Sequence, residues 1–296
     1  MGIKFTGTGV ALVTPFNQRN ALDLESLGRL LEHTSAVDYW VVNGTTGESP
    51  VLADGERKKI LQFVGENNRR NLPVMFGIGG NNTQAILQQI KFTDFSNIQA
   101  ILSVCPYYNK PTQEGLFRHY SVIADHSPVP VYIYNVPGRT SCNIDASTLL
   151  RLAEHPNIHG VKEASPEPTQ WEELGSNKPN NFQLISGDDL STISIIRLGG
   201  TGVISVMANA FPELIKKMVN NALDHNWYEA NSILEVLMPI NSLMYQESNP
   251  VGVKKALHLL GICEPYVRLP LIKASEELGA SIAAAFPMMS LEPKKP

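Results

Sequence analysis

The sequence is poor in the features that mark disulfide-rich and metal-binding proteins. It has only three cysteines, Cys105, Cys142 and Cys263, which are far apart and odd in number, so they fit neither a disulfide framework nor a zinc site. The seven histidines show no HExxH or similar ligand spacing. The sequence therefore predicts no metal centre, and free cysteines are typical of a reducing cytoplasm.

Long apolar runs and a strong excess of one charge are also missing. No run reaches the length of a membrane span, and the N-terminus lacks a charged segment followed by a signal-like apolar stretch. The net charge of −4 gives no reason to expect a nucleic-acid partner. Hydrophobic residues make up 43% of the 296 residues, enough for one large domain or two smaller ones. We expect a cytoplasmic protein that binds neither membrane nor nucleic acid.

Short apolar runs alternate with longer amphipathic segments over the first two thirds of the chain. Several of these segments begin with a capping residue, such as Asp23 or Thr112, followed by apolar residues at helical spacing. The runs between them have the length and composition of buried strands. The eight predicted strands are residues 9–14, 39–42, 73–76, 98–104, 129–134, 158–162, 182–186 and 202–206.

Strands that alternate with helices predict a parallel sheet with right-handed crossovers. Eight such repeats favour a closed (β/α)8 TIM barrel over the alternative, an open doubly wound sheet. After Phe211 the strand pattern stops, and the predicted helices are residues 212–221, 226–245, 251–260 and 269–285. We therefore expect a barrel in residues 1–210 and a C-terminal helical region, 211–296, packed on it.

A lysine at the end of the sixth predicted strand is the most informative residue. Lys162 ends an apolar run, where burial of an ammonium is costly and lowers the lysine pKa toward the neutral amine. A neutral amine is the group that forms a Schiff base with a carbonyl substrate. The alternative is a snorkelling or salt-bridged side chain, so the neighbouring motifs must decide between the two.

Other polar residues follow the predicted strands at the end where barrel enzymes carry their active sites. Tyr134 and Arg139 follow the fifth strand and supply a phenol for proton transfer and a guanidinium for a carboxylate. The second strand leads into Gly44-Thr-Thr-Gly-Glu48, whose glycines let backbone N–H groups converge on an anion. The fourth and seventh strands are followed by Tyr107-Tyr108 and by Gly187-Asp-Asp189.

Each of these motifs also has a purely structural interpretation. Glu48 can cap a helix after a simple turn, and the Tyr107-Tyr108 pair can be core or interface packing. Asp188 or Asp189 is expected to cap the next helix rather than bind a metal. The common position of the motifs at one rim of the predicted barrel favours an active site.

These motifs together resemble one family over nearly the whole chain. Gly44-Thr-Thr-Gly-Glu48, Tyr134-Asn-Val-Pro-Gly-Arg139-Thr, Gly160-Val-Lys162-Glu and Ser186-Gly-Asp-Asp189 are similar to the motifs of the dihydrodipicolinate synthase and N-acetylneuraminate lyase family. Its members are pyruvate-dependent class I aldolases. The combination of four motifs is highly specific.

The resemblance implies a role for each motif residue. Lys162 matches the lysine that forms the imine with pyruvate, so no separate cofactor is expected. Tyr134, Thr45 and Tyr108 match a proton-relay triad in which Tyr108 comes from the neighbouring subunit, which implies a homo-oligomer, expected as a dimer of dimers. Thr45 and Thr46 match the pyruvate carboxylate site. Gly187 and Ile204 match backbone contacts around the imine.

Within that family, Arg139 decides the expected reaction. A guanidinium can grip the carboxylate of an amino-acid aldehyde with two hydrogen bonds, and the synthases carry an arginine at the matching position. We expect pyruvate to condense with aspartate-4-semialdehyde on the route to diaminopimelate and lysine. The alternatives are an aldolase for N-acetylneuraminate or another 2-keto sugar acid, a pyridoxal phosphate enzyme using the same lysine, and a non-catalytic binding protein.

Feedback inhibition by lysine is expected to be weak or absent. Ser49, Asn81 and Tyr107 match the site at which inhibited relatives bind lysine. The positions that hold two histidines and a glutamate in the inhibited enterobacterial type are Asp54, Arg57 and Ala85. Arg57 would repel the ammonium of lysine and Ala85 cannot pair with it, whereas Asp54 supplies some compensating charge.

Overall fold

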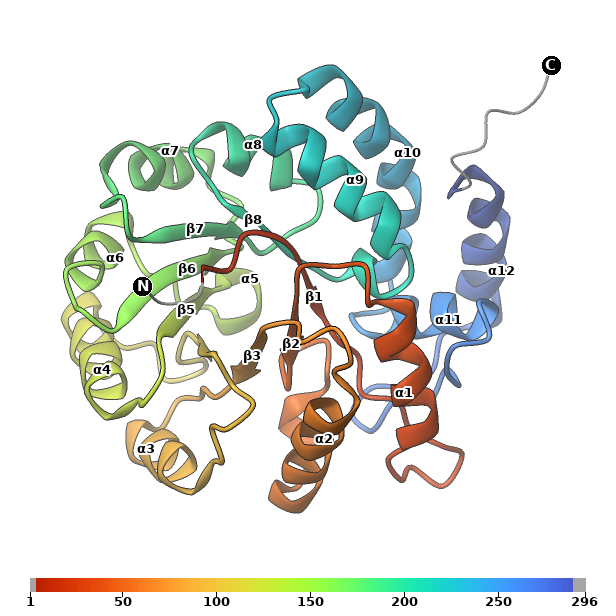
Figure 1. Ribbon diagram of the computed structural model, residues 1–296, viewed down its shortest axis with the longest axis horizontal. Helices are drawn as coiled ribbons and strands as arrows, with labels where there is room; N and C mark the ends of the chain where they lie inside the picture. The colour runs from red at the N-terminus through yellow and green to blue at the C-terminus, as the bar shows by residue number, and fades with distance from the viewer. Residues whose placement is uncertain (1–3, 290–296) are drawn as a thin grey trace. The chain divides into compact units, whose positions relative to one another are not determined.

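The computed structural model describes residues 4–289, and its eight strands follow one another in chain order around a closed barrel (Figure 1). The pairs with a described register are all parallel. The predicted TIM barrel is confirmed, and the open doubly wound sheet is wrong. The strands are β1 Gly7–Ala11, β2 Tyr39–Val42, β3 Val74–Gly77, β4 Ala100–Val104, β5 Val131–Asn135, β6 Ile158–Glu163, β7 Gln183–Ser186 and β8 Gly202–Ser205.

Helices separate successive strands and continue after β8, as the sequence predicts. Asp23 caps α1 by accepting from the Ser26 N–H, and Thr112 caps α4 by accepting from the Gly115 N–H. The helices are α1 Leu24–His33, α2 Asp54–Asn67, α3 Thr83–Phe92, α4 Gln113–His126, α5 Pro137–Thr140, α6 Ala146–Leu152, α7 Pro168–Asn177, α8 Thr192–Arg197, α9 Pro212–Leu223, α10 Trp227–Tyr245, α11 Val251–Leu259 and α12 Glu276–Ala285. Short 3-10 turns are η1 Ser49–Val51, η2 Met207–Asn209 and η3 Phe286–Met289.

The chain divides into two compact units. Unit 1 comprises residues 4–6 and 73–204, and unit 2 comprises residues 7–72 and 205–289. The predicted division into 1–210 and 211–296 stays a prediction. The outermost parts of those two ranges, residues 1–3 and 290–296, lie outside the described residues.

Unit 1 contains β3 to β7 in continuous parallel register. Helices α3, α4, α6 and α7 contact one another in that order and cover the outer side of these strands in Figure 1. The strand residues are therefore covered on both faces, which explains their continuous apolar runs. Val131, Ile133 and Val161 are among those with no exposed surface.

In unit 2, β1 pairs with β2, and α9 packs against β1 and α10. Helix α10 also contacts α11 and α12. The first three predicted helices after residue 211 are confirmed as α9, α10 and α11. The fourth, predicted for 269–285, is too long. Helix α12 begins at Glu276, because Ser275 accepts from the Leu278 N–H and ends the non-helical segment that contains Pro270.

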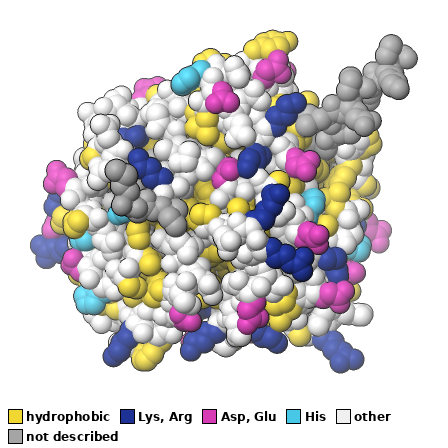
Figure 2. Space-filling model, viewed as in Figure 1, with side chains coloured by type: hydrophobic (Ala, Val, Ile, Leu, Met, Phe, Trp, Pro, Cys, Tyr) yellow, Lys and Arg dark blue, Asp and Glu magenta, His cyan; other side chains and the backbone are white. Residues whose placement is uncertain are grey.

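The surface carries both signs of charge. On the face drawn in Figure 2, lysine and arginine side chains are interspersed with aspartate and glutamate rather than gathered in one basic field. Within residues 4–289, none of the helices combines the length and the apolar character needed to span a bilayer.

Candidate functional site

Lys162 and Tyr134 lie side by side in unit 1. Each lies one residue before the end of its strand, β6 or β5, and the parallel register pairs the two residues directly. Only 5% of Lys162 and 7% of Tyr134 is exposed. The Lys162 Nζ lies 4.2 Å from the centre of the Tyr134 ring, so the predicted imine lysine and its predicted proton-transfer partner are in contact.

The Lys162 amine touches no counter-ion. Within residues 4–289 its Nζ makes no hydrogen bond and no ion pair, so the salt-bridged alternative is wrong. Burial lowers the pKa of Lys162 to about 7, the Asp189 carboxylate opposes this shift, and the Arg139 guanidinium adds to it. A neutral amine is therefore available near neutral pH for attack on a carbonyl carbon.

A buried glutamate that was not predicted from the sequence holds the strand ends behind Lys162. Glu163 points to the opposite side of β6, because strand side chains alternate. Its carboxylate accepts from Asn135 Nδ2 at 3.1 Å, from the Ser165 N–H at 2.6 Å and from Gln170 Nε2 at 2.9 Å. Burial raises the pKa of Glu163, and these hydrogen bonds oppose the shift. The sequence did hold a signal, since Asn135 directly follows Tyr134 and Glu163 directly follows Lys162.

The end of β7 approaches Lys162 closely. The Gly187 N–H donates to the Glu163 carbonyl at 2.7 Å. A Cβ at Gly187 would lie 2.7 Å from the Ala164 Cβ, so only glycine permits this approach. Ile204 is fully buried in β8, next to Val203, which pairs with Ser186 of β7. Gly187 directly follows β7 and Ile204 lies in the neighbouring β8, and their contacts with the imine stay a prediction.

Two predicted site residues are exposed. Arg139 lies in the short helix α5, directly after β5, and its charge reaches Lys162. Tyr108 is 88% exposed and has a φ of +76°, an uncommon backbone conformation for a bulky residue. Tyr107 is 43% exposed, so core packing is the wrong interpretation for this pair.

The predicted anion loop, residues 44–49, belongs to unit 2. It closes on itself through bonds from the Gly47 and Ser49 N–H groups to the Gly44 carbonyl. Within the described residues the N–H groups of Thr45 and Thr46 donate to no protein group. The loop thus presents two adjacent backbone donors, as an anion site needs.

Glu48 does not act as a helix cap. Its side chain makes no capping bond to η1. The carboxylate is instead 3% exposed and forms an ion pair of 2.5 Å with Lys254, which is completely buried in α11. Lys254 could not be predicted as its partner, because a lysine in an apolar helix has the pattern of a snorkelling side chain.

The aspartates after β7 also differ from the expectation. Helix α8 begins after Ser191, and no side chain caps it. Asp188 accepts from the Ser191 N–H at 2.9 Å and so closes the preceding turn, while Asp189 is 98% buried. The predicted aspartate cap is therefore wrong in position. Both carboxylates favour the charged form of Lys162 instead.

The residues at the predicted lysine-inhibition positions are partly engaged with one another. Arg57 forms a 3.1 Å ion pair with Asp54 and donates to the Ser49 carbonyl at 3.0 Å. Asn81 donates to the Tyr107 carbonyl at 3.1 Å. Asp54 thus partly neutralises Arg57, in line with the compensating charge expected from the sequence.

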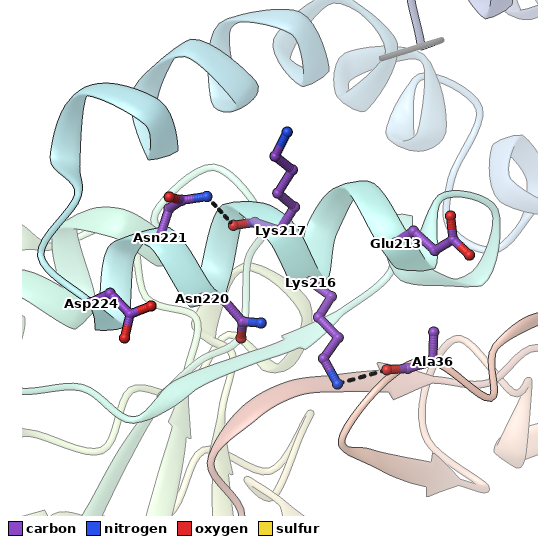
Figure 3. A pocket seen from close by; sticks show the side chains of 7 residues that line it. All are labelled: Ala36, Glu213, Lys216, Lys217, Asn220, Asn221 and Asp224. Carbon is purple, nitrogen blue, oxygen red and sulfur yellow. Dashed lines mark hydrogen bonds between the residues drawn. The ribbon is translucent and has the colours of Figure 1, made fainter. Parts of the chain in front are cut away.

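A shallow hollow on unit 2 contains none of the predicted site residues. It lies along α9, where Lys216 donates to the Ala36 carbonyl at 2.7 Å, a bond drawn as a dashed line in Figure 3. Lys216 also pairs with Asp38, so its charge is already matched. Among the described His, Cys, Asp and Glu side chains, no group of three is arranged to hold a metal ion.

Comparison with known proteins identifies relatives over nearly the whole length. The chain matches the dihydrodipicolinate synthetase family over residues 4–287. A 4-hydroxy-tetrahydrodipicolinate synthase from Cytophaga hutchinsonii is 50% identical over 276 residues, which cover 93% of each chain.

Solved structures agree with the sequence comparison. The dihydrodipicolinate synthase of Thermotoga maritima has a TM-score of 0.93 at 36% identity, covering 96% of this chain and 98% of that one. A monomeric dihydrodipicolinate synthase variant has the same TM-score and identity, covering 96% and 97%. With the motifs, the barrel and these similarities in agreement, the chain belongs to the dihydrodipicolinate synthetase family.

Proposed function

We propose that the chain is a 4-hydroxy-tetrahydrodipicolinate synthase, which joins pyruvate, held as a Schiff base on Lys162, to L-aspartate-4-semialdehyde. One observation carries the proposal: Lys162 is 95% buried, unpaired within residues 4–289, and has a pKa lowered to about 7. The name of the half-identical Cytophaga relative supports the choice of substrates.

The Lys162 amine starts the reaction by attacking the keto carbon of pyruvate. The carbinolamine loses water to give an imine, and loss of a methyl proton gives an enamine whose carbon attacks the aldehyde. The covalent link to substrate replaces a separate cofactor. Near neutral pH the amine is already partly neutral, so it needs no strong base to activate it.

Proton transfer in these steps is assigned to Tyr134, Thr45 and Tyr108. The contact between the Tyr134 ring and the Lys162 Nζ supports Tyr134 as the group nearest the imine nitrogen. The exposure of Tyr108 suits a side chain that acts in the site of a neighbouring subunit. A chain of hydroxyl groups can pass the proton between the carbinolamine and the solvent.

The two substrate carboxylates are assigned to different groups. Thr45 and Thr46 would bind the pyruvate carboxylate through their unused N–H groups and through the Thr46 hydroxyl. Arg139 would bind the carboxylate of the semialdehyde in bidentate fashion. Gly187 and Ile204 would contact the imine through their backbone, supported by their adjacent positions at the ends of β7 and β8.

We further propose a cytoplasmic homo-oligomer, arranged as a dimer of dimers. The exposure of Tyr108 supports its contact with a neighbouring chain. One of the related structures is a monomeric variant. Sedimentation of the active protein tests this, with Tyr108→Phe expected to slow turnover while leaving assembly intact. A fully active monomer would contradict it.

The decisive experiment offers both candidate substrates in parallel. Consumption of aspartate-4-semialdehyde with pyruvate is followed in a coupled assay, and cleavage of N-acetylneuraminate is followed beside it. We expect turnover only in the first. Turnover only in the second would favour the lyase, which the relatives do not favour.

A further inference from the structure

The loop that carries Thr45 and Thr46 is held by residues some two hundred positions later in the chain. Asn249, two residues before the start of α11 at Val251, donates from Nδ2 to the Thr46 Oγ1 at 3.0 Å. Both side chains are buried, Thr46 with 2% and Asn249 with 5% exposed. This is the one hydrogen bond of the Thr46 side chain within residues 4–289.

The direction of this bond decides where the hydroxyl hydrogen of Thr46 goes. With the Asn249 amide turned so that Nδ2 faces Thr46, its Oδ1 has no partner within the described residues, and the Thr46 oxygen is an acceptor whose own hydrogen must find a different partner. The hydroxyl is thus left as a donor, which is the form that a carboxylate ligand requires. An aspartate at position 249 would accept this hydrogen and reverse the polarity.

A second contact fixes the other end of the loop. Glu48 has left-handed backbone geometry, with φ 56° and ψ 36°, which a non-glycine residue adopts only when its surroundings hold it. Its carboxylate accepts from Lys254 Nζ at 2.5 Å and from the Arg268 N–H at 2.9 Å. Lys254 also donates to the Tyr266 carbonyl at 2.7 Å, so the lysine is itself anchored.

We propose that Asn249 and Lys254 are positioning residues for the carboxylate of the 2-oxo acid substrate, acting through Thr46 and Glu48. Asn249 sets the donor direction of the Thr46 hydroxyl, and Lys254 sets the backbone of the loop. This inference rests on the proposed function, which assigns the pyruvate carboxylate to Thr45 and Thr46.

The first test compares Asn249→Ala with the isosteric Asn249→Asp. The measurement is the pyruvate concentration that half-saturates trapping of the imine by borohydride. We expect it to rise about tenfold in Asn249→Ala and about a hundredfold in Asn249→Asp, which turns the hydroxyl away and adds negative charge. The KM for the semialdehyde should stay within about threefold. A purely structural role predicts the reverse order, because alanine leaves a cavity.

Two controls separate positioning from general destabilisation. In a Thr46→Val background, the half-saturating pyruvate concentrations of the two Asn249 variants should differ by no more than about threefold, since the hydroxyl is gone. Asn241→Asp is the matched control, because Asn241 is equally buried in α10 and has no hydrogen bond to the loop. It should lower the melting temperature without changing the pyruvate constant. Persistence of the difference in Thr46→Val would overturn the proposal.

The second test needs no activity. In Lys254→Met, amide hydrogen exchange at Gly47, Glu48 and Ser49 should accelerate at least about tenfold relative to the strands, because their turn is no longer held. Lys254→Arg should keep part of the protection. Unchanged exchange in Lys254→Met would refute the role of Lys254 in holding the loop. Failure of the wild type to form an imine with pyruvate would refute the proposed function alone.

Discussion

Two buried lysines in this chain have opposite surroundings. Lys254 has no exposed surface and meets a carboxylate at 2.5 Å and a carbonyl at 2.7 Å. Lys162 is slightly less buried, at 5% exposed. Both amines lie over an aromatic ring, Tyr134 for Lys162 and Phe16 for Lys254, but within residues 4–289 only Lys162 lacks a counter-ion in contact. Burial lowers the pKa of both, but Glu48 directly opposes the shift at Lys254.

Depth of burial does not by itself make a lysine a nucleophile. A buried ammonium that is paired and fully hydrogen-bonded stays an ammonium and acts as a structural anchor. A buried amine without a counter-ion in contact loses its proton more easily and keeps its lone pair. Substitutions at the two positions should therefore have different consequences, one for chemistry and the other for stability.

The largest effect is expected from Lys162→Arg. Guanidinium stays protonated and cannot form the imine, so turnover should fall by at least about a thousandfold while the protein stays folded. Borohydride with pyruvate should add mass to the peptide that contains Lys162 in the wild type and not in the variant. An adduct on the peptide that contains Lys254 would reverse the assignment of the two lysines.

Lys254→Met should destabilise the fold more than any substitution at Lys162. It leaves the Glu48 carboxylate buried without a partner, which is expected to lower the free energy of unfolding by about 3–5 kcal/mol. The double variant Glu48→Gln/Lys254→Met should recover part of that loss in urea unfolding. Lys162→Met, which removes an unpaired lysine, should by contrast not destabilise. An equal loss in the free energy of unfolding for Lys254→Met and Lys162→Met would remove the distinction between the two lysines.

Arg139→Ala should harm the semialdehyde step more than imine formation. Losing one charge-assisted bidentate contact is expected to cost about 2 kcal/mol, or roughly thirtyfold in kcat/KM for the semialdehyde. Pyruvate trapping should persist, with the pKa of Lys162 slightly raised, because the guanidinium contributes to lowering it. Wild-type kcat/KM for the semialdehyde in the variant would show that Arg139 does not bind this substrate.

The pH dependence should report the lowered pKa of Lys162. Its folded pKa of about 7 lies below the ordinary value of 10.5, so the rate of imine trapping should fall about tenfold per pH unit below 7 and level off above it. Between these two values the unfolded chain binds more protons, so the contribution of Lys162 to stability should rise with pH. A trapping rate that still climbs from pH 8 to pH 10 would mean that Lys162 keeps its ordinary pKa.

The smallest effect is expected from added lysine. Arg57 places a cation where inhibited relatives are expected to carry a histidine or a carboxylate, although Asp54 partly neutralises it. Ala85 cannot pair with the ammonium of lysine. Millimolar lysine should therefore change the initial rate little. Half-inhibition at micromolar or sub-millimolar lysine would contradict this expectation.

Local patterns in the sequence predict much of the barrel and its strand-end residues. The apolar runs before Tyr134 and Lys162 are local signals, and the caps at Asp23 and Thr112 are formed by neighbours three residues away. The parallel register then brings Tyr134 and Lys162 together without further information. For this reason the contact between Lys162 and Tyr134 in unit 1 could be predicted from sequence.

One kind of error concerns partners that are far apart in sequence. Glu48 and Lys254 are 206 positions apart, and neither of their local patterns specifies the other. The start of α12 was also missed, because apolar content continues through residues 269–275 although the backbone is not helical. Periodicity describes which face of an element is buried but not which side chain it meets.

The contacts of Asn249 and Lys254 have a consequence for the order of synthesis. The loop at residues 44–49 leaves the ribosome before Asn249 and Lys254, which lie 203 and 206 residues after the Thr46 and Glu48 that they hold. A nascent chain halted after β8 would contain Lys162 and Tyr134 but not the side chains that orient Thr46 and Glu48. Binding of a 2-oxo acid by the new protein would therefore begin only after α11 has been synthesised.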